Sequence, residues 1–153
     1  MKPLIALVLL ALMSNAAMAQ EAQEPPETPV EAGVMRPDTD DLQQFVWKNR
    51  PLVVFADSPN DPRFIQQMAY LEAQLDALAE RDAVVLSDTD PEAKSALREK
   101  LHPRGFMLVL IGKDGTIYLR KPFPWDVREI TRSIDKLPMR QQEVRDRRAG
   151  AEN

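Results

Sequence analysis

The chain of 153 residues contains no cysteine. Because the thiolate is the nucleophile in thiol–disulfide exchange, dithiol oxidoreductase activity is excluded for this chain acting alone. The fold also has no disulfide to stabilise it, so packing of its core must hold the domain together. A single histidine leaves the sequence equally poor in transition-metal ligands, and we expect no cofactor.

The chain also lacks an excess of positive charge. Its formal net charge is −4, its pI is near 5.1, and its basic residues are mixed among acidic ones. Proteins that bind nucleic acid or anionic lipid usually carry a basic patch or stripe. Neither partner is therefore expected.

A long apolar run occurs only once, at Leu4–Met13, between Lys2 and the small residues of Ala17-Met18-Ala19. A bilayer-spanning helix needs about 20 residues, so this run is too short to be one. The three parts together predict a signal peptide at residues 1–19, although an uncleaved anchor is the alternative. The mature protein would be periplasmic or secreted, with no membrane insertion after signal cleavage. No cysteine follows the run, which excludes lipoprotein attachment.

Both ends of the mature chain are polar. Residues 20–40 form an acidic stretch with four prolines, and such a composition is typical of an extended linker. Residues 138–153 are rich in charge and are interpreted as a polar C-terminal tail, in which Glu143 and Arg147 could pair. Residues 41–137 between them have the length of one autonomous domain.

Four apolar segments predict strands at 52–56, 83–88, 106–112 and 116–121. Helical spacing of apolar residues predicts helices at 62–80, 91–101 and 125–137. Asp61-Pro62 and Asp90-Pro91 each supply an N-cap followed by proline at the first helical position. The order βαβαββα predicts an α/β fold, a thioredoxin-like sandwich around a central four-stranded mixed sheet.

Four segments, NRPLVVFA, ERDAVVL, LIGKDGTIYLR and IDKLPMRQQE, resemble a thioredoxin-like family of domains of unknown function. That family includes short exported bacterial proteins, and the module also occurs in vertebrate sushi-repeat and related extracellular matrix proteins. The resemblance covers about Trp47 to Glu143. It implies a thioredoxin-like fold and a location outside the cytoplasm, but no established reaction.

The same resemblance locates the position of the missing thiols. When Phe55 and Pro62 are aligned with thioredoxins, Asn60-Asp61-Pro62-Arg63 falls where those proteins carry Cys-Gly-Pro-Cys. Met107 takes the place of their cis-proline. A cis bond before a residue other than proline costs about 2.5–4 kcal/mol, so we expect a trans peptide here.

Polar residues that follow the first strand are the candidates for a binding cleft. Open α/β sheets bind ligands at the carboxyl ends of their parallel strands, where these residues would lie. Arg63, in the first turn of a helix, could receive an anion, but pairing with Asp57 or Asp61 is the preferred interpretation. A nucleophile–base pair of Ser58 with His102 is a remote alternative. The candidate cleft residues are Asp57, Ser58, Asn60, Asp61, Arg63 and Met107.

A cation site is the weaker candidate. Asp88, Asp90 and Glu92 offer oxygen atoms at alternate positions, as hard-cation loops do, but the glycine and later glutamate of a calcium loop are absent. Helix capping by Asp90 explains that residue without a metal.

These observations favour an exported, redox-inactive module that binds an unknown periplasmic or extracellular protein. The alternative is a non-thiol enzyme, or a binder of a small ligand or cation, that uses the cleft at the carboxyl edge of the parallel strands. The sequence contains no recognisable catalytic set, so an enzyme is the less favoured class.

Overall fold

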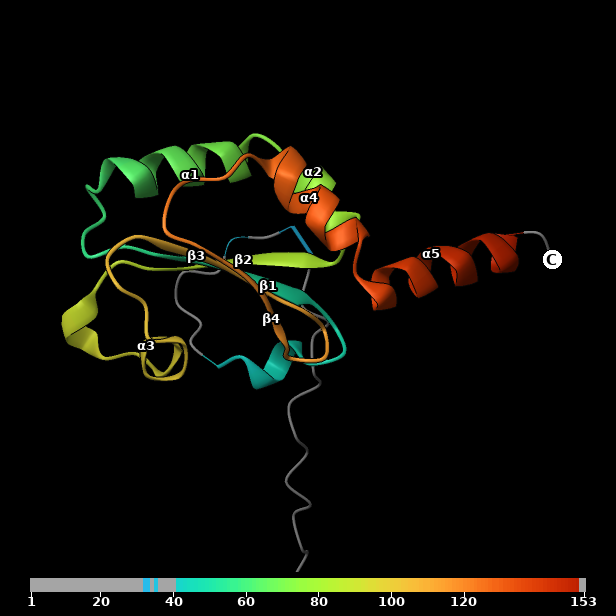
Figure 1. Cartoon of the computed structure of the whole chain (residues 1–153), viewed down its shortest axis with the longest axis horizontal. Coiled ribbons are helices and arrows are strands. Elements are labelled where there is room, and N and C mark those ends of the chain that lie inside the picture. The colour runs from blue at the N-terminus through green and yellow to red at the C-terminus, as the bar shows by residue number, and fades with distance from the viewer. Residues whose placement is uncertain (1–31, 34, 36–40, 152–153) are drawn as a thin grey trace, which may run out of the picture.

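The computed structural model of the chain describes residues 32, 33, 35 and 41–151 (Figure 1). The predicted signal peptide at 1–19 lies outside these residues, as does most of the predicted linker at 20–40. The described part contains a four-stranded sheet with helices on both faces, and one further helix extends away from it (Figure 1). Within these ranges, no helix combines the length and apolar character needed to cross a membrane.

The sheet has the strand order β2-β1-β3-β4. Strand β1 pairs in parallel with β2 and antiparallel with β3, and β3 pairs antiparallel with β4. The predicted four-stranded mixed sheet and the element order βαβαββα are therefore confirmed. The strands are β1 (Arg50–Phe55), β2 (Ala83–Asp88), β3 (Met107–Ile111) and β4 (Ile117–Lys121).

Two hydrophobic clusters fill the two faces of the sheet. Successive side chains of a strand point to opposite faces, so Leu52 and Val54 join one cluster while Val53 and Phe55 join the other. Strands β2 and β3 divide their residues in the same way. Both faces of the central strands are thus buried, which explains their continuous apolar sequences.

The helices are distributed between these two faces (Figure 1). Buried residues of α1, α2 and α4 pack in the Leu52 cluster, and those of the short helix η1 and of α3 pack in the Phe55 cluster. The bounds are η1 (Gln43–Phe45), α1 (Pro62–Glu72), α2 (Leu75–Ala79), η2 (Pro91–Ala93), α3 (Ala96–Leu101) and α4 (Val127–Asp135).

Two predicted helices are each interrupted once. The helix predicted at 62–80 is divided between α1 and α2, because Gln74 leaves the helical region with φ −140° and ψ 38°. In the helix predicted at 91–101, Lys94 adopts a left-handed conformation at φ 47°. Ser95 then begins α3 anew, with its hydroxyl accepting a hydrogen bond from the Arg98 N–H.

Residues interpreted as a polar tail form helix α5 (Pro138–Ala151), which runs outward from the end of α4 (Figure 1). Most of its side chains are exposed, but Arg140 is buried. The first half of α5 is therefore part of the packed structure.

Part of the predicted linker lies against the edge of the sheet. Gly33 donates its N–H to the carbonyl of Ala83, and Met35 forms a parallel bridge with Val85. Gly33 has φ +74°, and a Cβ there would lie 2.8 Å from the Cβ of Ala79. Glycine is therefore required at this close approach to α2.

Candidate functional site

The loop that follows β1 forms an open depression at the carboxyl end of that strand. Five of the six predicted cleft residues line this depression, namely Asp57, Ser58, Asn60, Asp61 and Arg63. Pro62 completes the lining. Asp57 and Asn60 are exposed, and the Ser58 hydroxyl accepts a hydrogen bond from the Asn60 N–H. The fold thus brings these five side chains together, as the sequence predicts.

The side chains of Asp61 and Arg63 form hydrogen bonds with each other. One carboxylate oxygen of Asp61 accepts from the backbone N–H of Arg63, at 2.9 Å, and so caps α1. The same carboxylate accepts from Nε and Nη2 of Arg63, at 3.1 and 2.8 Å. Hydrogen bonds from the Arg63 side chain and backbone lower the pKa of Asp61. The predicted pairing of Arg63 with a neighbouring aspartate is confirmed.

Phe106 forms the apolar support beneath this pair. Its ring is buried and lies 5.6 Å from the guanidinium carbon of Arg63, in cation–π geometry. The neighbouring Gly105 has φ +60° and would place a Cβ 3.9 Å from an Asp57 carboxylate oxygen. Sequence reasoning missed Phe106, although its place directly before a buried strand was a usable signal.

Met107 does not join the depression. It is the first residue of β3, and its side chain packs with the Phe55 cluster on the opposite face from Phe106. Its sulfur lies 3.6 Å from Nη1 of Arg120. The placement of Met107 in the cleft is therefore wrong, because neighbouring residues along an extended chain point to opposite faces. No cis peptide bond occurs in the described part of the chain, which agrees with the expected trans bond.

Two of the three carboxylates considered for a cation, Asp88 and Asp90, are bound to other groups, while Glu92 is exposed. Asp88 accepts from Nε of Arg98 at 2.9 Å and from the Ser95 hydroxyl, and Arg98 also donates to the carbonyl of Ala56 at 2.7 Å. Burial raises the pKa of Asp88, but its hydrogen bonds with Ser95 and Arg98 outweigh that effect and lower it overall. This pair fastens α3 to the ends of β1 and β2.

Asp90 is occupied in the same way, since its carboxylate accepts from the N–H groups of Glu92 and Ala93 at 3.0 and 3.3 Å and caps η2. Among residues 32, 33, 35 and 41–151, no three histidine, aspartate or glutamate side chains are grouped to hold a metal ion. His102, which ends α3, has no hydrogen bond with Ser58.

A cluster of charged side chains lies at the opposite end of the strands from the depression, where β1 begins. We call it the basal ion cluster; its members are Arg50, Asp82, Lys113, Arg140 and Glu143. Arg50 is fully buried and donates to the Arg81 carbonyl and to Glu143, both at 2.9 Å. Lys113 bridges Asp82 and Glu143, at 2.8 and 2.9 Å. Glu143 lies 3.4 Å from Nη1 of Arg140. The cluster joins α5 to the start of β1 and to the β3–β4 turn.

Glu143 is the centre of this cluster. Burial raises its pKa, but hydrogen bonds and charge interactions with Arg50 and Lys113 outweigh burial and lower the pKa to about 2. Arg50, Lys113, Arg140 and Glu143 come from the sequence segments that carry the family resemblance. These segments therefore build a structural joint and not the depression at residues 57–63.

The fold defines a thioredoxin-like domain, and the chain contains no cysteine. The chain belongs to the family described as "Domain of unknown function (DUF4174)", which matches residues 41–143. No curated protein sequence matches the chain.

Two solved structures are similar in fold. The reduced 2-Cys peroxiredoxin of Plasmodium vivax has 19% identity and a TM-score of 0.53, with 66% of this chain and 84% of that chain covered. Prx1a of Plasmodium yoelii, modified at its N-terminus, has 19% identity and a TM-score of 0.51, with 66% and 80% covered. At this identity the likeness shows the thioredoxin-like fold and nothing of activity.

Proposed function

We propose that the chain is an exported, redox-inactive thioredoxin-like module that acts by binding a protein outside the cytoplasm. The observation that carries this proposal is the Asp61–Arg63 pair. It lies within residues 60–63, the segment that aligns with Cys-Gly-Pro-Cys of thioredoxins, in a chain without cysteine. The surface around Asn60 is exposed, and the chain carries no thiol there. Such a surface is suited to recognition.

Exposed apolar side chains support a protein as the partner. Ile65 on α1 is 55% exposed and Phe123, after β4, is 52% exposed. Aromatic residues dominate the binding energy of many protein interfaces. The apolar run and the Ala-x-Ala sequence of residues 1–19 support export.

Site-specific photo-crosslinking in living cells tests the proposal. A photoreactive residue is placed at Asn60 or, as a matched control, at Lys136, since both side chains are exposed and lie on different parts of the surface. We expect a discrete protein adduct from Asn60 and none from Lys136. Identical adducts from the two positions, or none from either, would contradict binding through this face.

The alternative is a non-thiol enzyme or small-ligand binder that uses the depression itself. This alternative predicts that Asp57→Ala abolishes the catalytic or ligand-binding activity while the melting temperature stays unchanged. A protein-binding face tolerates loss of one polar group, because binding energy is concentrated in a few buried anchors. Crosslinking with the Asp57→Ala variant separates the two: an undiminished adduct favours the protein partner.

A further inference from the structure

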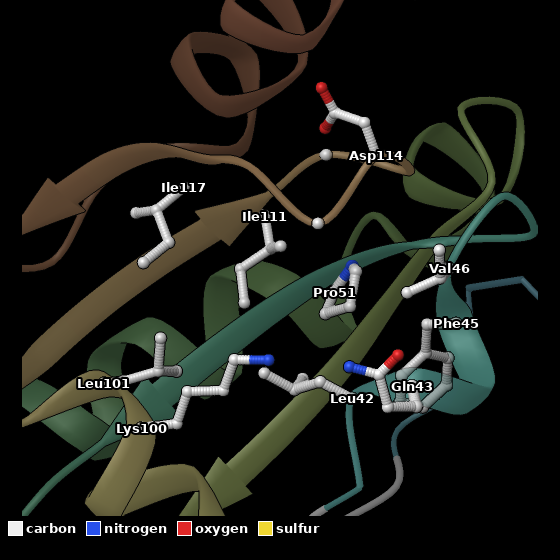
Figure 2. Close-up of a pocket in the computed structure, with 12 residues that line it drawn as sticks. Leu42, Gln43, Phe45, Val46, Pro51, Lys100, Leu101, Ile111, Asp114 and Ile117 are labelled. Atoms are coloured by element: carbon white, nitrogen blue, oxygen red, sulfur yellow. The ribbon is translucent and has the colours of Figure 1, made fainter.

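A second pocket lies on the face of the sheet that η1 and α3 cover (Figure 2). It has a volume of about 320 Å³, which falls in the range of small-molecule sites. Its walls are mainly apolar: Leu42, Phe45, Val46, Pro51, Leu101, Ile111 and Ile117. Sequence reasoning missed this pocket, because its walls come from four separate segments of the chain.

The pocket is built from rigid parts. Phe45 and Leu101 are 1% exposed and Ile111 is 3% exposed, so these walls belong to the packed core. At Gly112, which also lines the pocket, a Cβ would lie 2.4 Å from the Tyr118 ring. Glycine therefore permits Tyr118 to pack on the β3–β4 turn. A pocket with such walls is preformed and needs little reorganisation to bind a ligand.

Two hydrogen-bond donors are directed into this apolar space. In Figure 2 the side-chain nitrogens of Lys100 and Gln43 point toward each other across the end of Leu42. In the part of the chain that the structure describes, Lys100 has no ion pair and the Gln43 side chain has no hydrogen bond. A cation and an amide are thus available at one place.

The one acidic residue of the pocket does not offset them. The Asp114 carboxylate points away from the middle of the pocket (Figure 2). It accepts hydrogen bonds from the Thr116 N–H and hydroxyl, each at 3.0 Å, and from the Tyr118 hydroxyl at 3.1 Å. The unpaired charge that faces the pocket is therefore positive.

We propose that this pocket binds a short apolar monocarboxylate. Lys100 and Gln43 donate hydrogen bonds to its carboxylate, and the walls formed by Leu42, Ile111 and Ile117 enclose its apolar body. A charge-assisted hydrogen bond is stronger than a neutral one, so the ammonium group selects the carboxylate over an uncharged group of similar size. The proposal does not depend on the protein-binding function, because no residue lines both this pocket and the depression at residues 57–63.

Titration of the ¹⁵N-labelled protein, residues 20–153, with hexanoate and with hexan-1-ol tests the proposal by NMR. We expect hexanoate to shift the amide resonances of η1, α3 and the β3–β4 turn, and to bind about tenfold more tightly than the alcohol. No shift at these amides with millimolar hexanoate would overturn the proposal. Equal binding of the acid and the alcohol would overturn the role of Lys100.

Two variants complete the test. Lys100→Met keeps the aliphatic stem without the charge, and we expect it to lose the tenfold preference for the acid. Lys94→Met is the matched control, since Lys94 is also exposed but does not line the pocket, and its preference should not change. A short peptide ending in a free leucine carboxylate serves as a competitor. If it binds far more tightly than hexanoate, a protein chain end replaces the small molecule as the ligand and overturns the proposal.

Discussion

Buried or nearly buried charged residues form ion pairs at both ends of the strands of this sheet. Arg50 at the start of β1 is fully buried and relies on Glu143, whose side chain is only 20% exposed. Arg98 and Asp88 form an ion pair at the other end of the strands, where β2 ends, and their side chains are 10% and 9% exposed. Breaking a pair of this kind leaves one desolvated charge behind, which costs far more than the pair contributed.

For Glu143→Gln we expect the free energy of unfolding to fall by about 3 kcal/mol at neutral pH. The pKa of Glu143 is lowered from 4.5 to about 2 in the folded state, so its contribution is complete above pH 4.5. That contribution is lost as the pH falls from 4.5 toward 2, so urea unfolding across this range should show a larger loss in the parent protein than in the variant. A part of the loss is common to both, because the pKa values of Asp61 and Asp88 are also lowered in the folded state. Glu129→Gln is the control, because the side chains of Glu129 and Arg132 are 42% and 55% exposed. A change above about 0.5 kcal/mol in this variant would be unexpected.

A second substitution separates a structural from a metal-binding role at Asp88. Asp88→Asn should lower the free energy of unfolding by about 3 kcal/mol, because Arg98 loses its partner. In Asp90→Asn, the matched control, asparagine still caps η2 and stability should hardly change. Thermal melting of the parent protein with millimolar calcium should show no shift. A clear calcium-dependent rise in the melting temperature would restore the cation hypothesis.

The elements differ in how well the sequence predicts them. Leu52–Ala56 and Met107–Ile111 are continuous apolar runs, and the buried strands follow directly from them. The division between α1 and α2 has no such signal, since no glycine or proline occurs at Ala73-Gln74. Local propensity alone favours a continuous helix there, and only packing of α2 on the sheet decides the break.

The joint at α5 was harder to predict for a different reason. Its charges are typical of a solvated segment, and nothing near Glu143 in the sequence identifies Arg50 and Lys113 as partners. The same limit applied to the pocket but not to the depression. Five of six cleft residues were predicted because they follow one strand, whereas the pocket needs contributions from distant segments.

Two truncations test the importance of α5. A chain that stops after Leu137 lacks Arg140 and Glu143, so Arg50 loses its carboxylate partner and Lys113 keeps only Asp82. We expect its free energy of unfolding to fall by about 3 kcal/mol or more, measured by urea unfolding. A chain that stops after Asp146 keeps the Glu143 contacts but loses the longer Arg147–Asp82 contact of 3.8 Å, and it should remain within about 1 kcal/mol of the parent. Equal losses in the two truncated chains would contradict the role of the basal ion cluster.

At the scale of the whole molecule, a thioredoxin-like fold is retained without the thiols that usually give it chemistry. Both faces of the sheet are covered by buried hydrophobic clusters, so the fold is stabilised by core packing without a disulfide. Two separate surfaces remain for recognition, the depression at residues 57–63 and the pocket between η1 and α3. The proposed export places both surfaces outside the cytoplasm.

The export proposal predicts a defined mature end. Expressed in a bacterium with two membranes, the full chain should yield a periplasmic protein whose intact mass corresponds to a start at Gln20. Replacing Ala17 and Ala19 with arginine should leave the precursor uncleaved, because the peptidase requires small residues there. Recovery of the unaltered chain from the cytosol at its precursor mass would contradict export.

The joint at the basal ion cluster also determines how the molecule responds to mechanical tension. Helix α5 is held at its first half by ion pairs, whereas β1 is hydrogen-bonded to strands on both sides. A force applied to the C-terminus therefore loads the ion pairs of α5 before the sheet, first the long Arg147–Asp82 contact and then the contacts of Glu143. The helix would detach while the sheet stays intact, so that the domain lengthens in a separate first step under load.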